Sequence, residues 1–216
     1  MATPSVIAEC AAATALRSVL HRVRQAAERS GRTAEAVRVV AVGKTKPASL
    51  VRQLYDAGHR YFGENYAQEL VDKAPQIANY LDRAVASLGR KPLKVLVQVN
   101  TSGEECNQVF AAKSGVEPSR CLELASHVKS SCPNLSFSGL MTIGMPDYTS
   151  TPENFKTMTN CRVDVCNALG IPEEQCELSM GMSGDFEQAI EMGSTNVRIG
   201  STIFGPREYP KKNQSH

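Results

Sequence analysis

A lysine lies at the end of a short apolar run near residue 40, where it could act as a nucleophile. Four apolar residues, 39–42, precede Gly43 and Lys44. Such a run is typical of a strand buried on both faces. In a dry pocket, desolvation would lower the pKa of Lys44, and its neutral amine could attack an aldehyde such as pyridoxal 5′-phosphate or a carbonyl sugar. A solvated or ion-paired lysine is the alternative, and Lys46, before Pro47, is expected to point outward.

The segment 198–205, RIGSTIFG, offers groups that suit a phosphate. Gly200, Ser201 and Thr202 follow an apolar strand and supply backbone N–H groups and two hydroxyls. In (β/α)8 barrels a phosphate site commonly lies after the last two strands. An ordinary Gly-Ser turn is the alternative. The phosphate interpretation gains weight if the first and last strands are neighbours, as in a closed barrel.

Two further polar residues are candidates for contact with a cofactor ring. Arg198 lies between Val197 and Ile199, so its side chain faces opposite to both. A guanidinium beside a pyridine nitrogen would stay protonated and hold that nitrogen unprotonated. An ion pair at a barrel rim is the alternative. Asn65, in the segment FGEN, could contact a ring oxygen, orient the lysine or form a turn.

The composition is that of an ordinary soluble domain. Lys and Arg number 24 against 22 Asp and Glu, so the net charge of +2 predicts neither a nucleic-acid nor a membrane partner. Seven cysteines without a C-x-x-C pair indicate reduced, buried thiols in a cytosolic compartment. The first residues predict an amphipathic helix rather than a transit peptide, which favours a cytoplasmic over a mitochondrial location. Its expected apolar face is Leu16, Val19, Leu20, Val23 and Ala27.

Strands and helices alternate along the chain, which predicts an α/β fold with a parallel sheet in one domain, 1–216. The expected strands are 37–42, 61–65, 94–100, 135–144, 177–185 and 196–205. The expected helices are 47–57, 66–90 with a kink or split at Pro75, one burying Leu122, Leu124 and Val128, 152–170 and 186–193. Polar, glycine-bearing strand ends favour a (β/α)8 TIM barrel. A doubly wound sheet is the alternative, although no G-x-G-x-x-G follows an early strand. Only about six of the eight strands are recognisable.

Several motifs together resemble the pyridoxal phosphate homeostasis protein family, also called YggS-like proteins or proline synthase co-transcribed homologues. They are VVAVGKTKP, FGENYAQEL, KVLVQVNTSGEE, FSGLMTIG and the run from ELSMGMSGD to IFGPR. The resemblance implies a barrel similar to the N-terminal domain of alanine racemase. It implies that Lys44 holds the cofactor as an internal aldimine and that Arg198 meets its pyridine nitrogen. It places Asn65 beside the ring and surrounds the phosphate with Ser183, Gly200, Ser201 and Thr202.

The chain departs from this family between the FGEN segment and residue 80. Family members carry there a Trp-His-Phe-Ile-Gly strand, a His-Leu-Gln-Ser-Asn-Lys segment, a helix and another strand. Here Ile77 runs directly into Ala78, and the chain has no tryptophan. A missing strand–helix–strand unit of roughly 30 residues would account for the two strands not found. The stretch 106–112 looks inserted. We hypothesise a splice variant whose incomplete barrel is less stable and binds the cofactor more weakly.

The leading functional interpretation is a monomeric, non-enzymatic protein of vitamin B6 homeostasis that holds pyridoxal phosphate, with apo-enzymes as recipients. An alanine-racemase-like or transaminase-like enzyme is the first alternative. Racemases need an acid or base on the second face of the ring, supplied by a further domain, and we expect none because the chain ends at His216. Two more interpretations are a Schiff-base aldolase that acts on a phosphorylated sugar and a truncated isoform with impaired cofactor binding.

Overall fold

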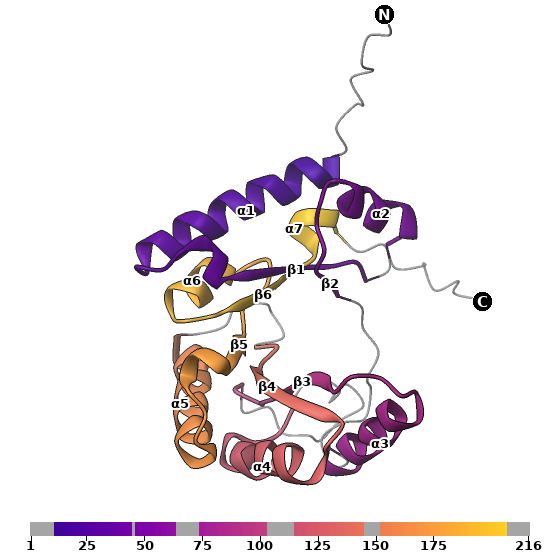
Figure 1. Ribbon diagram of the computed structural model, residues 1–216. Helices are drawn as coiled ribbons and strands as arrows, with labels where there is room; N and C mark the ends of the chain where they lie inside the picture. The colour runs from indigo at the N-terminus through magenta and orange to yellow at the C-terminus, as the bar shows by residue number, and fades with distance from the viewer. Residues whose placement is uncertain (1–10, 45, 64–73, 103–114, 145–151, 207–216) are drawn as a thin grey trace, which may run out of the picture.

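The computed structural model describes residues 11–44, 46–63, 74–102, 115–144 and 152–206, in which helices and parallel strands alternate (Figure 1). The strands are β1 (Arg38–Val42), β2 (Phe62–Gly63), β3 (Leu93–Gln98), β4 (Leu135–Met141), β5 (Glu177–Ser179) and β6 (Asn196–Ile199). The α-helices are α1 (Ala11–Arg29), α2 (Ala48–Asp56), α3 (Ala74–Ser87), α4 (Cys121–Ser131), α5 (Pro152–Leu169), α6 (Phe186–Glu191) and α7 (Ser201–Phe204). Short 3₁₀ helices cover Ala34–Ala36, Pro118–Arg120 and Glu173–Gln175. No helix in these ranges is long and apolar enough to cross a membrane.

The six strands form one parallel sheet in the order β2-β1-β6-β5-β4-β3. The first and last strands are neighbours, with Val40 paired to Arg198 and Ala41 to Ile199. This order follows the circle of a closed barrel, except that within the described residues β2 and β3 do not pair with each other. The expected α/β fold, an incomplete barrel with six recognisable strands, is confirmed.

Helices cover the outer side of the curved sheet in two groups (Figure 1). One core cluster joins α1 to β1, β6 and α6, and the other joins α3, α4 and α5 to β3, β4 and β5. Alternation along the strands creates these cores: Val39 and Ala41 of β1, like Val197 and Ile199 of β6, are buried on the helix side. Residues between them face the inside of the curve.

The buried faces of two helices differ slightly from the sequence prediction. Along α1, the alanines at both ends share the buried stripe, and Leu20 falls on its border with 42% of its surface exposed. In α4 the buried stripe is Cys121, Leu124, Ala125 and Val128, which leaves Leu122 36% exposed. The predictions that Leu20 and Leu122 belong to the core face are therefore wrong.

The region of the expected deletion is continuous helix on both sides of Ile77-Ala78, because this junction lies inside α3. Pro75 is the second described residue of α3, and residues 64–73, which precede the helix as described, lie outside the described ranges. The predicted kink or split at Pro75 therefore stays a prediction, because the residues on its amino-terminal side lie outside the described ranges. Asn65 and the stretch 106–112 lie outside the described residues.

Candidate functional site

Lys44 lies just after the carboxyl end of β1, in a turn, and is half-buried. The start of the 200–202 loop lies against the same strand end. A Cβ atom built on Gly200 would come within 3.2 Å of the carbonyl oxygen of Val42. The pairing of β1 with β6 thus brings the lysine and the predicted phosphate loop to one end of the sheet.

The predicted phosphate loop begins the one-turn helix α7. The backbone N–H groups of Ile203 and Phe204 donate to the carbonyl oxygen of Gly200 at 3.0 and 2.9 Å. The backbone N–H of Thr202 donates to Oγ of Ser183 at 3.3 Å. The segments that follow β5 and β6 therefore contact each other. Ser183 lies beside the loop 200–202, as the family resemblance implies.

Arg198 reaches from β6 across the inner side of the sheet. One of its terminal nitrogens donates to the carbonyl oxygen of Ser179 at 2.9 Å and to its Oγ at 2.8 Å. The other donates to the carbonyl oxygen of Thr142 at 2.6 Å. Burial lowers the pKa of Arg198 to about 10, an effect that the nearby carboxylate of Asp185 opposes. The guanidinium therefore stays charged at neutral pH in a fixed orientation.

The anchors of Arg198 were not among the predicted site residues. Ser179 and Thr142 are each 2% exposed. The hydroxyl of Thr142 also shares a hydrogen bond of 2.9 Å with that of Thr101. Side chains alternate between the two faces of a strand, and the neighbours of Ser179, Leu178 and Met180, are fully buried. The argument used for Arg198 would therefore have placed Ser179 on the inner face as well. No local pattern indicates Thr142, because its partner lies 56 residues away.

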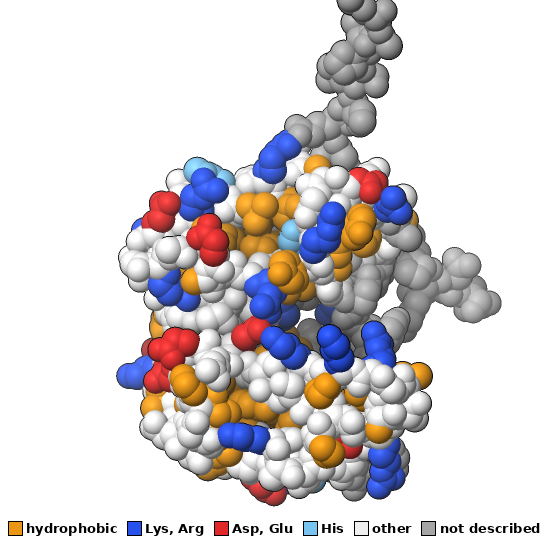
Figure 2. Space-filling model, viewed as in Figure 1, with side chains coloured by type: hydrophobic (Ala, Val, Ile, Leu, Met, Phe, Trp, Pro, Cys, Tyr) orange, Lys and Arg blue, Asp and Glu red, His pale blue; other side chains and the backbone are white. Residues whose placement is uncertain are grey.

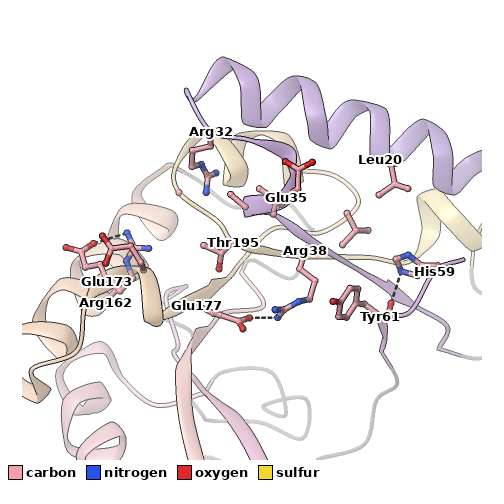
Figure 3. A pocket seen from close by; sticks show the side chains of 15 residues that line it. Leu20, Arg32, Glu35, Arg38, His59, Tyr61, Arg162, Glu173, Glu177 and Thr195 are labelled. Atoms are coloured by element: carbon pink, nitrogen blue, oxygen red, sulfur yellow. Dashed lines mark hydrogen bonds and ion pairs between the residues drawn. The ribbon is translucent and has the colours of Figure 1, made fainter.

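A depression of about 790 Å³ lies at the opposite end of the sheet, near the first residues of the strands (Figure 3). Two of its arginines are paired with acids: Arg38 contacts Glu177 at 2.6 Å, and Arg162 contacts Glu173 at 3.0 Å. A third, Arg32, donates to the backbone carbonyl oxygens of Ser194 and Ile190. Charged side chains surround the hollow at the middle of the face in Figure 2. In the described ranges no group of three His, Cys, Asp or Glu is placed to hold a metal ion. Lys44 does not line this depression.

The donor groups at the carboxyl end of the strands fit pyridoxal phosphate. Lys44 provides an amine for the aldehyde, and Arg198 provides a fixed cation that can donate to the ring nitrogen. The loop 200–202 and Ser183 provide hydroxyl and N–H groups of the kind that bind phosphate. These side chains come from the ends of β1, β5 and β6, which adjoin in the sheet.

Comparison with known proteins gives one consistent result. The family model of the alanine racemase N-terminal domain matches residues 34–208. The pyridoxal phosphate homeostasis protein of Mus musculus is 43% identical over 256 aligned positions, covering 96% of this chain and 91% of that protein. That alignment is longer than the 216 residues of the chain, so it contains positions of the mouse protein that have no counterpart here.

Solved structures agree with the sequence match. A crystal structure of an unknown protein from Bifidobacterium adolescentis is 29% identical, with a TM-score of 0.74 over 90% of this chain and 94% of that one. PipY of Synechococcus elongatus, solved with PLP bound, is 25% identical, with a TM-score of 0.63 over 90% of this chain and 100% of that one. From its sequence match and its fold, the chain belongs to the pyridoxal phosphate homeostasis protein family.

Proposed function

We propose that this chain binds pyridoxal phosphate at the carboxyl ends of β1, β5 and β6 and acts in homeostasis of the cofactor as a carrier without turnover. The pairing of β1 with β6 is the observation that carries the proposal, because it brings Gly200 against Val42, two residues before Lys44. The name of the mouse relative and the PLP bound to PipY support the choice of ligand.

Bound pyridoxal phosphate supplies an aldehyde and a ring that can withdraw electrons. In this proposal Lys44 would hold the cofactor through its amine, which can condense reversibly with an aldehyde. Thr202, Ser201 and Ser183 orient the phosphate, and Gly200 lets the loop approach the end of β1. Asn65 is proposed to lie beside the ring. A reversible bond suits a carrier, since the aldehyde can be returned to an apo-enzyme.

Arg198 is proposed to disfavour turnover. Its guanidinium is held by Ser179 and Thr142, so it can donate to a ring nitrogen without giving up its proton. With a pKa of about 10, it remains a poor proton donor at neutral pH. A ring nitrogen that is not protonated withdraws electrons weakly, so a carbanion on a bound amino acid gains little stabilisation. The side chain therefore favours holding the cofactor over catalysis.

The cellular setting is part of the same proposal. We propose a monomer in the cytoplasm that delivers the cofactor to apo-enzymes. The internal deletion near 77–78, as in a splice variant, would leave the inner side of the barrel open between β2 and β3 and weaken binding relative to full-length relatives.

A titration with pyridoxal phosphate tests binding and site together. The absorbance band of a lysine-bound cofactor should rise with added cofactor in the unchanged chain and be absent in Lys44→Ala. Lys46→Ala is the matched control, because Nζ of Lys46 already donates to the carbonyl oxygen of Pro206 at 2.6 Å. Borohydride should fix the cofactor to the peptide containing Lys44. Equal bands in the unchanged chain and Lys44→Ala would overturn the assignment.

A second measurement tests the absence of turnover. The loaded protein is incubated with L-alanine, and D-alanine and pyruvate are measured over hours. We expect neither product above the level given by free cofactor. Formation of either product that depends on Lys44 would replace the carrier by a racemase-like or transaminase-like enzyme.

A further inference from the structure

The depression at the amino-terminal end of the sheet is the part of the molecule that the proposed cofactor site does not use (Figure 3). Its volume of about 790 Å³ falls within the range of about 300–1,000 Å³ that is usual for sites that hold small molecules. The segments that lead into β1, β2, β5 and β6 line it, and they bring charges of both signs and apolar side chains to one place.

Arg32 is a cation of this depression that contacts only neutral acceptors. Its terminal nitrogens donate to the carbonyl oxygens of Ser194, at 2.9 Å, and of Ile190, and its Nε donates to Oγ of Ser30 at 3.4 Å. These bonds fix the guanidinium, which is half-buried, but use only three of its five N–H donors. Within the described residues no carboxylate pairs with it, so its charge is available to an anion from outside the chain.

Arg162, which α5 contributes, is only partly satisfied by the protein. Its Nη2 contacts Oε2 of Glu173 at 3.0 Å, and its Nε is buried and has no hydrogen-bond partner among the described residues. Burial, and after it the charge of Arg162, lowers the pKa of Arg32, so the two guanidiniums repel each other. A ligand carboxylate would offset this repulsion, because its two oxygens accept from guanidinium groups with good geometry.

An acid and an apolar wall lie beyond these arginines. In Figure 3, Arg32 and Arg162 lie toward one end of the depression and Leu20 and Tyr61 toward the other, with Glu35 between the two groups. Leu20 is 42% exposed and Tyr61 is 53% exposed, so both offer apolar surface to a ligand. The depression therefore presents a cation, an anion and an apolar surface in sequence.

This set of groups suits a zwitterion better than a metal ion or a phosphate. In the part of the chain that the structure describes, no three His, Cys, Asp or Glu side chains are grouped to hold a metal ion. Four glutamates and three arginines line the depression, so a doubly charged phosphate would meet an excess of negative charge. A molecule with one carboxylate and one ammonium group is instead attracted by both kinds of side chain.

We propose that the depression binds a free α-amino acid with an apolar side chain. Its carboxylate accepts hydrogen bonds from Arg32 and Arg162, and its ammonium group pairs with Glu35. Its side chain packs against Leu20 and Tyr61. The binding is non-covalent and lies at the opposite end of the sheet from Lys44, so it does not depend on whether the chain binds pyridoxal phosphate.

Three ligands with the same ring test the two charges separately. The full chain without cofactor is titrated in a calorimeter with L-phenylalanine, with 3-phenylpropionate, which lacks the ammonium group, and with phenethylamine, which lacks the carboxylate. We expect 3-phenylpropionate to bind about two- to fivefold more weakly than phenylalanine, because an exposed ion pair contributes little. Phenethylamine should bind more than about tenfold more weakly, because it loses charge-assisted hydrogen bonds.

Variants locate the binding in the depression. Arg32→Gln should weaken phenylalanine more than about tenfold and reduce its advantage over phenethylamine. Glu35→Gln should weaken it about two- to fivefold and remove its advantage over 3-phenylpropionate. Glu174→Gln is the matched control, because Glu174 is also an exposed acid of the depression but is given no contact with the ligand.

The ligand series on the unchanged chain and the exposed Glu35 decide the proposal if Arg32→Gln fails to fold. Three results would each overturn it. They are a lack of saturable binding of L-phenylalanine to the unchanged chain, binding of phenethylamine as tight as that of phenylalanine, and equal losses of affinity in Glu35→Gln and Glu174→Gln.

Discussion

Gly200 lies so close to the end of β1 that a Cβ atom on it would be 3.2 Å from the carbonyl oxygen of Val42. Contacts this short are uncommon for real Cβ atoms, so a side chain here requires the strand end or the loop to shift. Lys44 is two residues beyond Val42. The absence of a side chain at Gly200 therefore lets the loop 200–202 lie against the end of β1, two residues before Lys44.

Gly200→Ala is expected to weaken binding of pyridoxal phosphate by about tenfold, equivalent to about 1.4 kcal/mol. The φ of −115° at Gly200 suits alanine, so the effect comes from the contact with β1 and not from backbone strain. A cofactor titration measures it. Gly170→Ala is the matched control, because Gly170 has φ +62° and open space around it. That variant should lose about 1 kcal/mol of unfolding free energy and keep its affinity.

Ser179→Ala is expected to lower the free energy of unfolding by about 1.5–3 kcal/mol, because it removes a buried acceptor from a charged donor, Arg198. Urea denaturation measures the change. Ser183→Ala removes the longer bond from the N–H of Thr202 and should cost only about 0.5–1.5 kcal/mol. Equal losses in both variants would show that Ser179 does not anchor the guanidinium.

His59 is expected to make the fold less stable in mild acid. Its ring is half-buried, Nε2 donates to the carbonyl oxygen of Tyr61 at 2.8 Å, and burial lowers its pKa below 6.5. The unfolded chain therefore binds a proton at a higher pH than the folded chain, and the free energy of unfolding decreases as the pH falls below about 6.5. Denaturation midpoints at about pH 7.5 and 5.5 should differ less in His59→Gln than in the unchanged chain. The same difference in both would exclude His59 as the source.

Local sequence patterns are sufficient for most of the fold. Apolar runs locate all six strands, and the helix termini that can be compared agree with the structure within a few residues; the start predicted at residue 66 lies outside the described residues. The predicted buried faces are wrong at Leu20 and Leu122, which are apolar but partly exposed. Helical periodicity indicates which side of a helix is buried, but it does not show how wide the buried face is. The short helix α7, which follows Gly200, lies inside the segment 196–205 that the sequence predicts as a strand. Its four residues are too few to show a helical period.

The candidate site is predictable in part. Lys44, Arg198 and the loop 200–202 are each visible in the sequence, and the pairing of β1 with β6 brings their strands together. The anchors of Arg198 are not visible, because the bond to Thr142 joins residues from different strands. Whether Arg198 reaches Thr142 depends on the order and curvature of the strands, and neither can be inferred from the spacing of residues along the sequence. Whether these residues bind pyridoxal phosphate stays a prediction for the titration to test.

The gap between β2 and β3 leads to a prediction about stability and affinity together. Leu93, at the start of β3, is 43% exposed, and within the described residues neither β2 nor β3 has a strand on its outer side, where β3 has just an isolated bridge from Val116 at its end. Unpaired strand edges leave backbone N–H and C=O groups to solvent and invite association. A barrel closed by two further strands would pair these groups and cover the inner face near Arg198.

Inserting the corresponding segment of the mouse relative between Ile77 and Ala78 should therefore raise the free energy of unfolding. It should also increase the urea m-value, because more surface becomes buried on folding. Affinity for pyridoxal phosphate should rise in the same variant. A Gly-Ser linker of equal length at the same junction is the control, since it interrupts α3 equally but cannot form strands. If the linker and the mouse segment give the same m-value and affinity, the gap in the sheet is not what limits this chain.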